Sequence, residues 1–270
     1  MKFLILGDIF PSAIKLIENK LPKIIKKLKI DFIIANGENA SMDANGITPY
    51  VAKKLFNCGV DVITSGNHIW DKNEILNYID SEKRLLRPFN MKDHLPGLGI
   101  NIYEKKKKKI CVVNLMTNFF MPKTKNVFEI TKLIIKKYKL KKNCDYIIVD
   151  VHGEFAGEKM AIGHILDGKA TLVVGTHTHI PTLDAMILPK GTAYQTDLGM
   201  CGDYDSVIGL NKKIFIERIL KVNLKKKNLP ASKNPTICGS LVNANSKNGL
   251  AKSINQIIIK TNFNRNILKY

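Results

Sequence analysis

Histidines, carboxylates and side-chain amides stand just after five apolar runs of the sequence, where they could bind metal ions. The five segments are Gly7-Asp8, Gly37-Glu38-Asn39, Gly66-Asn67-His68, 150–153 and 175–179. The apolar runs are typical of buried strands, and functional sites of open α/β sheets gather beyond the carboxyl ends of strands. We therefore expect the five loops to converge. A glycine before the polar residues predicts a sharp backbone turn there.

These segments supply a nitrogen and oxygen ligand set. The candidate ligands are three imidazoles, two carboxylates and two amides: His152, His177, His179, Asp8, Glu38, Asn67 and Asn39. His177 and His179 can face one pocket only if the backbone bends between them. A set without thiolate suits iron, manganese, zinc or cobalt. One cation takes about four to six ligands, so this set predicts two cations bridged by a carboxylate, which could clamp a phosphoryl group and activate water.

Each segment taken alone has a structural explanation. A lone buried histidine is more often a hydrogen-bonded core residue, and we interpret His94 and His164 in this way. Gly66-Asn67-His68 alone could be a turn, and many strands end in Gly-Asp. Asp150 is excluded because strand alternation points it away from the pocket. The conjunction of all five segments in this order favours a metal site.

The ordered segments resemble the calcineurin-like metallophosphoesterase superfamily, whose motifs run GD, GD or GE, GNH, a single histidine and GHxH. Longer stretches are similar to the bacterial YmdB-like family of 2′,3′-cyclic nucleotide phosphodiesterases: GDIF, NGENA, SGNHIWDK, DVHGE, DGKATLVVGTHTHIPT and LPKGTAYQTDLGM. The likeness covers nearly the whole chain. It implies a four-layer α/β/β/α sandwich, with two mixed sheets packed face to face between helices.

The resemblance also implies a role for each residue. Asp8 and His179 would hold one metal ion, Glu38 would bridge, Asn67, His152 and His177 would hold the other, and His68 would donate a proton to the leaving group. The two divalent or trivalent ions would be iron first, with manganese or zinc as alternatives. The implied reaction converts 2′,3′-cyclic nucleotides to 3′-nucleotides.

Two positions depart from the superfamily pattern, and the YmdB-like family shares both. Phe10 stands where a histidine ligand is usual, and Glu38 where an aspartate usually bridges. Asn39 could replace the lost ligand. Asp71, three residues after His68, would either orient that imidazole or cap the following helix.

Other functions stay open from the sequence alone. A 3′,5′-cyclic nucleotide phosphodiesterase, a nucleotidase or a phosphoprotein phosphatase would use the same metals. A regulatory, RNA-associated protein with weak residual activity is a further alternative, and so is a nucleic-acid-binding module.

Composition bounds the class of protein. The chain has 270 residues without a Pro/Gly/Ser-rich linker, which favours one α/β domain over 1–270. Its five cysteines are widely spaced and form no CxxC pair, as is typical of free thiols in a reducing compartment. The apolar run Phe3–Leu6 is too short for a signal peptide, and no stretch is long enough to span a bilayer. We expect a cytoplasmic protein without a membrane partner.

The net charge of +20 raises the question of an RNA partner. Only four of the 43 basic residues are arginines, however, and the lysines are scattered. Arginine is the more usual residue for bidentate phosphate recognition, so we favour solvated lysine surfaces, with a small phosphodiester as the partner. RNA binding and homo-oligomers are possible alternatives. The run Lys105–Lys109 is interpreted as a solvated loop.

The elements that position these residues follow from periodicity. Strands Lys2–Leu6, Asp31–Ala35 and Val60–Thr64 alternate with a helix over Ala13–Leu28, which Pro22 could kink, and one beginning at Thr48-Pro49. This βαβαβ series predicts a mainly parallel sheet. The later elements are a hairpin of Ile100–Tyr103 and Ile110–Leu115, a helix over Phe128–Leu140, and strands Tyr146–Val151, Leu172–Val174 and Ala193–Thr196. For the last third we expect strands Ile214–Val222, Thr236–Val242 and Ile254–Ile259, in a second sheet.

Overall fold

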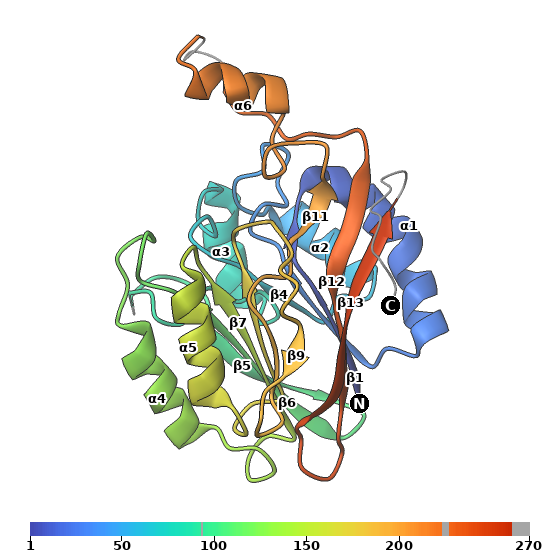
Figure 1. Cartoon of the computed structure of the whole chain (residues 1–270), viewed down its shortest axis with the longest axis vertical. Helices are drawn as coiled ribbons and strands as arrows, with labels where there is room; N and C mark the ends of the chain where they lie inside the picture. The colour runs from blue at the N-terminus through green and yellow to red at the C-terminus, as the bar shows by residue number, and fades with distance from the viewer. Residues whose placement is uncertain (93, 223–226, 261–270) are drawn as a thin grey trace.

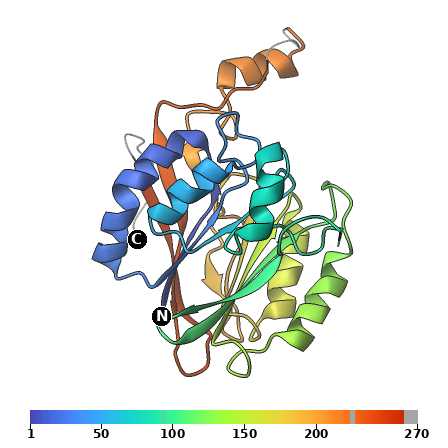
Figure 2. The same ribbon diagram turned by 180° about the vertical axis from the view of Figure 1, so that it is seen from behind.

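Two β-sheets pack face to face, and helices cover their outer faces (Figures 1 and 2). The computed structural model describes residues 1–92, 94–222 and 227–260. Within that range the first sheet has the strand order β2-β11-β12-β1-β3-β4, with β13 beside β12, and the second has the order β5-β6-β7-β8-β10-β9. The predicted α/β/β/α sandwich of two mixed sheets is confirmed. That the whole chain is one domain stays a prediction.

The bounds of the strands and helices are as follows. The first sheet contains β1 (Lys2–Leu6), β2 (Asp8–Ile9), β3 (Phe32–Asn36), β4 (Val62–Thr64), β11 (Met200–Asp203), β12 (Pro235–Ala244) and β13 (Ala251–Lys260). The second contains β5 (Ile100–Lys105), β6 (Lys108–Met116), β7 (Tyr146–His152), β8 (Leu172–Thr176), β9 (Met186–Ile187) and β10 (Ala193–Gln195). The helices are α1 (Pro11–Leu28), α2 (Pro49–Asn57), α3 (Asn73–Ser81), α4 (Val127–Lys137), α5 (Ala156–Leu166) and α6 (Lys212–Ile219).

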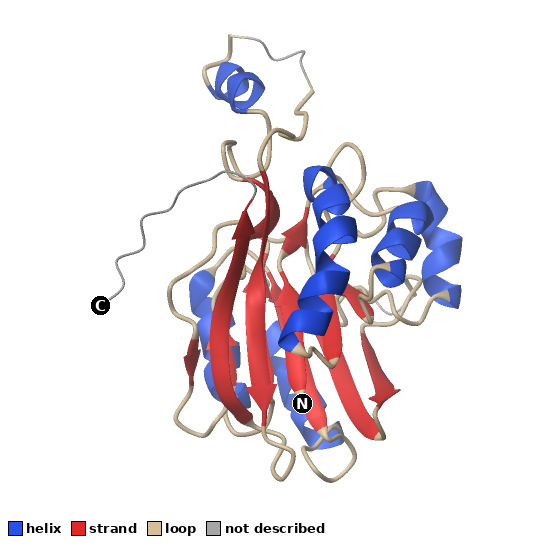
Figure 3. Ribbon diagram, turned by 90° about the vertical axis from the view of Figure 1, so that its right-hand side faces the viewer, coloured by secondary structure: helices blue, strands red, loops and turns tan. Residues whose placement is uncertain are grey.

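Alternation along the strands builds three apolar layers. In β1, Phe3 and Ile5 face the second sheet, whereas Leu4 and Leu6 face α1, α2 and α3. A third cluster lies between β6, β7, β8 and the helices α4 and α5. Because both faces of the central strands are covered, these strands are apolar throughout, as buried parallel strands usually are. The side view in Figure 3 shows the paired sheets with helices on either side.

Parallel pairing places the ends of the central strands at one edge of the sandwich. β1, β3 and β4 are parallel neighbours in the first sheet, and β6, β7, β8 and β10 are parallel neighbours in the second. All five segments that carry the candidate ligands follow, or end, one of these strands. The fold therefore satisfies the expectation that the loops meet at the carboxyl ends of strands.

Local signals account for the first two helices. Pro11 is the first residue of α1 and Pro49 the first residue of α2, where a proline costs no hydrogen bond. The Thr48 hydroxyl accepts a hydrogen bond from the Val51 amide, as expected for a helix cap. Pro22 does not split α1, which continues to Leu28; this proline is exposed, so water can satisfy the carbonyl left free one turn earlier.

Two expectations for the last third were wrong. Residues 214–222 do not form a strand: Lys212–Ile219 is helix α6, and the Asn211 side chain caps it by accepting from the amides of Lys213 and Ile214. The strands β12 and β13 do form, but they join the first sheet, because β12 pairs antiparallel with β1. Strand order depends on contacts distant in sequence, and no local pattern encodes them. Helix α5 also had no counterpart in the sequence interpretation, whereas α3 is the helix expected after Asp71.

The predicted hairpin forms, and the lysine run contains its exposed turn, Lys106-Lys107. The run is less of a loop than expected, because Lys105, Lys108 and Lys109 belong to the strands. Lys105 and Lys108 pair across the ladder, and the two turn residues, Lys106 and Lys107, have φ values of 53° and 58°. Two left-handed residues define a type I′ turn, the geometry that matches the twist of a hairpin. Lys105 and Lys106 form ion pairs with Asp61 and Asp31.

The five cysteines are all buried and free, as predicted. Among the described residues, no helix combines the length and the apolar character that crossing a membrane requires.

We predict that Lys107→Gly stabilises the protein by about 0.5–1 kcal/mol, because glycine adopts the left-handed conformation without the steric cost that lysine incurs. Urea unfolding monitored by circular dichroism would show a higher midpoint with an unchanged slope. Lys107→Ala is the control: it removes the same charge and keeps the strain, so it should give no gain. A loss of stability in Lys107→Gly would contradict the turn geometry.

Candidate active site

The ends of β1, β3, β4, β7 and β8 surround a cavity of about 330 Å³. Among the predicted site residues, those that line it are Glu38, Asn39, His68, His177 and His179. Asp8 and His152 are fully buried beside them. The structure thus brings the predicted residues to one place.

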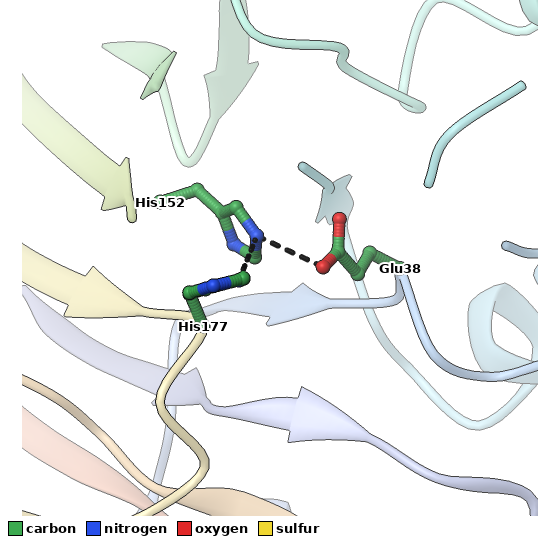
Figure 4. A group of neighbouring side chains, drawn as sticks. All are labelled: Glu38, His152 and His177. Carbon is green, nitrogen blue, oxygen red and sulfur yellow. Dashed lines mark hydrogen bonds and ion pairs between the residues drawn. The ribbon is translucent and has the colours of Figure 1, made fainter. Parts of the chain in front are cut away.

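Glu38, His152 and His177 form a close cluster of three side chains in the site (Figure 4). The Glu38 Oε1 atom lies 2.8 Å from His152 Nε2, and His177 Nδ1 lies 3.0 Å from the same nitrogen. One potential ligand atom from each residue lies within 4.8 Å of the others. Two imidazoles and a carboxylate at such distances can bind one cation together.

The protonation of His152 follows from the partners of its two ring nitrogens. Nδ1 lies 3.0 Å from the Thr176 hydroxyl, which itself donates to Asp150 Oδ1 at 2.8 Å. Since that hydroxyl proton is committed to Asp150, His152 Nδ1 carries a proton and donates it to the Thr176 hydroxyl. Burial would lower the pKa of His152, but the charge and hydrogen bond of Glu38 outweigh it and raise that pKa, so Nε2 carries a second proton that a bound cation would displace. A hydrogen bond of this kind orients a histidine for metal binding.

His179 and Asp8 form the second part of the site. The His179 Nδ1–H donates to the Ile208 carbonyl at 2.9 Å, so Nε2 is turned toward Asp8 Oδ1, 3.9 Å away. Asp8 Oδ2 accepts from the His177 amide, but Asp8 Oδ1 is buried without a hydrogen-bond partner among the described residues. An unsatisfied buried carboxylate oxygen costs about 1–3 kcal/mol or more, which a cation between Asp8 and His179 would offset.

Two amide oxygens are also buried and unpartnered within the described part of the chain, those of Asn39 and Asn67. Asn39 Nδ2 donates to the Ala44 carbonyl at 2.9 Å, which fixes the direction of its oxygen. Three orphaned oxygens at the ends of adjacent strands, with the imidazole nitrogens, fit a site for metal ions. A purely structural hydrogen-bond network would have satisfied them.

The pKa values reflect this crowding of buried charge. Burial raises the pKa of Asp8 to about 6, and the imidazoles of His179 and His152 offset this only in part. Burial would also raise the pKa of Glu38, but the charge and hydrogen bond of His152 outweigh it and lower that pKa to about 2. Burial, aided by the charge of His152, lowers the pKa of His177 to about 3. His177 is therefore neutral at physiological pH, the form that binds metal.

His68 lies at the mouth of the cavity with about a third of its side chain exposed. Its Nδ1 is 2.7 Å from Asp71 Oδ2, and its backbone amide donates to Glu38 Oε2 at 3.2 Å. Helix α3 begins two residues after Asp71 and has no side-chain cap. Of the two roles considered for Asp71, the geometry favours orienting His68.

Comparison with known proteins places this geometry in a family. The model of the family described as YmdB-like protein matches residues 4–257. The chain belongs to this family. A 2′,3′-cyclic-nucleotide 2′-phosphodiesterase of Bacillus subtilis is 38% identical over 261 residues, which cover 96% of this chain and 97% of that protein.

Two crystal structures have the same fold over nearly the whole chain. One is a hypothetical protein from Thermus thermophilus, with a TM-score of 0.89 and 33% identity, covering 96% of this chain and 99% of that one. The other is described as a novel phosphatase from Mycoplasma pneumoniae, with a TM-score of 0.89 and 33% identity, covering 96% and 93%. The resemblance predicted from sequence is confirmed, and with it the assignment of this YmdB-like chain to the phosphoesterases.

The motif glycines of this YmdB-like chain are required for close approach. A Cβ on Gly66 would lie 2.2 Å from Glu38 Oε2 and from the His152 ring, and a Cβ on Gly7 would lie 1.9 Å from the Gly199 carbonyl oxygen. Neither glycine has a positive φ. The expected turns do form after Gly37 and Gly66, whose carbonyls accept from the amides of Ala40 and Ile69, but close approach accounts for the absence of a side chain at Gly66. The backbone also bends at His177 and His179, whose φ values are 101° and 67°.

A buried ion pair between Lys159 and Asp197 holds the bent loop that carries His177 and His179. It was not predicted from the sequence. Lys159 Nζ donates to Asp197 Oδ2 at 2.9 Å and to the Thr176 carbonyl at 2.7 Å, and both charged side chains are almost fully buried. Asp197 also accepts from the amides of Thr178 and Gly199. Asp197 lies in the LPKGTAYQTDLGM stretch quoted for the family resemblance, which was the one available signal.

Asp150 was excluded from the ligand set, and its carboxylate does point away from the cavity. It accepts hydrogen bonds from Asn36, Thr64 and Thr176, and through Thr176 it supports the His152 ring. Its role is to position a predicted ligand.

We predict that Gly66→Ala lowers phosphodiesterase turnover at least about tenfold and stability by about 1–3 kcal/mol, because the new methyl group would displace Glu38 and His152. Turnover of bis(p-nitrophenyl) phosphate and thermal unfolding would measure the two effects. Gly202→Ala is the matched control, since its Cβ would meet nothing closer than 3.2 Å. Full activity in Gly66→Ala would contradict the close packing of the site.

Proposed function

We propose that this protein hydrolyses 2′,3′-cyclic nucleotides to 3′-nucleotides with two metal ions bound at the cavity. The observation that carries the proposal is that three buried oxygens, on Asp8, Asn39 and Asn67, lack a hydrogen-bond partner among the described residues and lie beside the imidazoles of His152, His177 and His179. The name of the Bacillus subtilis relative, a 2′,3′-cyclic-nucleotide 2′-phosphodiesterase, supports the choice of substrate.

The ligand assignment that we propose follows the pairs in the structure. Asp8, His179 and Asn39 would hold one ion, Glu38 would bridge, and Asn67, His152 and His177 would hold the other. Asn39 takes the place of the ligand lost at Phe10. The nitrogen and oxygen donors suit iron, with manganese or zinc as alternatives. When bound, the two ions would neutralise phosphoryl charge and supply a nucleophilic water near neutral pH.

His68 is proposed as the proton donor. Its Nδ1 is engaged by Asp71, which leaves Nε2 as the nitrogen available to a substrate in the cavity. Asp71 fixes the orientation of the ring, as carboxylates beside catalytic histidines do. The proton on Nε2 can then pass to the departing ribose oxygen.

The atoms of the reaction balance with water as the only co-reactant. The water oxygen bonds to phosphorus, the bond between phosphorus and the 2′ oxygen breaks, and His68 protonates that oxygen. The proton lost by water restores the imidazolium. The product is a ribose with a free 2′ hydroxyl and a 3′ phosphate.

The metal proposal predicts two ions per chain. Elemental analysis of the purified protein should give about two equivalents of iron, manganese or zinc. Asn67→Ala and His177→Ala should lower metal content and turnover together, because both residues are assigned to the same ion. Asn143→Ala, an exposed substitution away from the cavity, is the control. A single mononuclear site in anomalous scattering from a metal-replete crystal would overturn the proposal.

The proton-donor proposal predicts a dependence on the leaving group. A general acid contributes about 10²–10⁴-fold, most when the leaving group is a poor one such as a ribose hydroxyl. His68→Ala should lose that much rate on 2′,3′-cyclic AMP while keeping its metal. It should lose far less on bis(p-nitrophenyl) phosphate, whose leaving group needs little protonation.

His94 and His164 are both exposed, so their interpretation as core histidines was wrong. His164→Ala is the matched control, because His164 lies on α5 outside the cavity. Equal losses on both substrates would mean that His68 positions the phosphate. Turnover of phosphomonoesters alone, with none of the cyclic nucleotide, would contradict the proposed specificity.

A further inference from the structure

A second cavity, of about 360 Å³, adjoins the metal-site cavity. Asn45 and Leu210 line both, so a ligand that fills the first cavity can continue into the second. Its remaining lining residues are Asp43, Arg218, Lys227 and Asn228. Arg218 belongs to α6, which stands apart from the sheets at the end of the sandwich where the metal-site loops lie (Figures 1 and 3). None of these residues has a role in the proposed mechanism.

The second cavity has an excess of positive charge. Within the part of the chain that the structure describes, neither Arg218 nor Lys227 forms an ion pair, whereas Lys212 on the same helix pairs with Asp205 at 2.6 Å. The carboxylate that lines the cavity, Asp43, is already engaged: it accepts from Lys72 at 2.6 Å and from the Ser41 hydroxyl at 2.7 Å. Two cations without counter-charges beside an active site are suited to bind an anion. The guanidinium is the group that best matches a phosphate.

Asn228 supplies an independent indication of a ligand. Its side-chain oxygen is buried and, among the described residues, has no hydrogen-bond partner. A cavity that offers two cations and one free acceptor fits a ligand with both phosphate and hydroxyl groups. A ribose phosphate has both.

We propose that this cavity binds the phosphate on the 5′ oxygen of the cyclic nucleotide, and that the preferred substrate is the 3′ end of an oligoribonucleotide that terminates in a 2′,3′-cyclic phosphate. The inference rests on the proposed function. Arg218 and Lys227 bind the internucleotide phosphate, and Asn228 accepts from a ribose hydroxyl of the preceding nucleotide. The cyclic phosphate itself lies at the metal site, next to His68.

A third cavity favours a nucleic-acid chain over a lone 5′-phosphate. It has a volume of about 740 Å³ and shares Asp43 with the second cavity. Its lining includes Lys15, Lys54 and Tyr50, whose ring is about two-thirds exposed, with Lys54 Nζ 4.8 Å from the ring centroid. Lys54 is paired with Glu18 and Lys72 with Asp43, so Lys15 and the exposed ring of Tyr50 are the groups available to a single strand, whose bases stack on such rings. Each of the three cavities shares lining residues with the next, in an order that begins at the metal site.

Three substrates test the proposal: adenosine 2′,3′-cyclic phosphate with a free 5′ hydroxyl, the same compound with a 5′-phosphate, and the dinucleotide ApA with a terminal 2′,3′-cyclic phosphate. A hydrogen-bonded charge contact of this kind is worth about ten- to hundredfold in kcat/KM. We expect kcat/KM for the dinucleotide to exceed kcat/KM for the free 5′-hydroxyl compound by that factor. Arg218→Ala and Lys227→Ala should each reduce the preference, while changing turnover of the 5′-hydroxyl compound by less than about twofold. Asn228→Ala should lower kcat/KM for the dinucleotide only, because only the dinucleotide has the preceding ribose.

Lys213→Ala is the matched control, because it removes an equal charge from the same helix but does not line the cavity. Equal kcat/KM for all three substrates in the wild-type enzyme would overturn the inference while leaving the proposed function intact. A preference for the 5′-phosphate compound with no further gain for the dinucleotide would overturn the oligoribonucleotide as substrate. Equal slowing of every substrate in Arg218→Ala would show a structural role and overturn the subsite. Failure to hydrolyse any cyclic phosphate with metal bound would instead refute the proposed function.

Discussion

Buried negative charge is the constraint on which the arrangement of this molecule depends. Among the buried carboxylates of the described residues, Asp8, Glu38, Asp150 and Asp197 lie at or directly behind the candidate site. A buried ion that lacks a partner costs several kcal/mol, so each must be compensated. Asp197 has Lys159, and Asp150 has three hydrogen-bond donors. Asp8 and Glu38 have mainly imidazoles as neighbours. The proposed metal ions would compensate the negative charge that the imidazoles leave on Asp8 and Glu38. The two compensated carboxylates, Asp150 and Asp197, lie directly behind the residues assigned to those ions and support them.

The two compensated carboxylates make the site rigid from opposite sides. Asp150 acts through Thr176 on His152, whereas Asp197 and Lys159 hold the backbone on either side of His177. This second contact matters because the left-handed conformation of a residue such as histidine costs about 1–2 kcal/mol. A charged network that is fully satisfied can maintain such a conformation. The strained loop thus keeps its imidazoles in place before any ligand binds, and preorganisation of this kind favours catalysis.

The sequence predicted the parts of this arrangement that are local. Strands ending in Gly-Asp, Gly-Glu or Gly-Asn, and a histidine pair two residues apart, were sufficient to predict which loops meet. The supporting residues Lys159 and Asp197 were not predicted, because they are distant in sequence and carry no metal-binding signature. The strand order was not predicted for the same reason, since Leu6 of β1 pairs with Gly239 of β12, more than 230 residues later in the sequence. Helix α6 was interpreted as a strand because Ile214 and Ile216 alternate; none of its residues is buried, so its apolar pattern reflects no contact with the core.

Phe10 connects the metal site to the region around α6. At this position the superfamily pattern has a histidine, and the phenyl ring instead packs edge-on against His179, with 5.0 Å between ring centroids. A Cβ on Gly209 would meet the same ring at 2.4 Å, so the chain that leads to α6 must pass closely over it. The neighbouring Ile208 carbonyl then orients His179, and Leu210 forms the wall common to the first two cavities. Phe10 therefore provides the apolar surface against which Gly209 and Leu210 pack. A histidine at position 10 would place a polar ring under that segment, beside the residue that lines both the first and the second cavity.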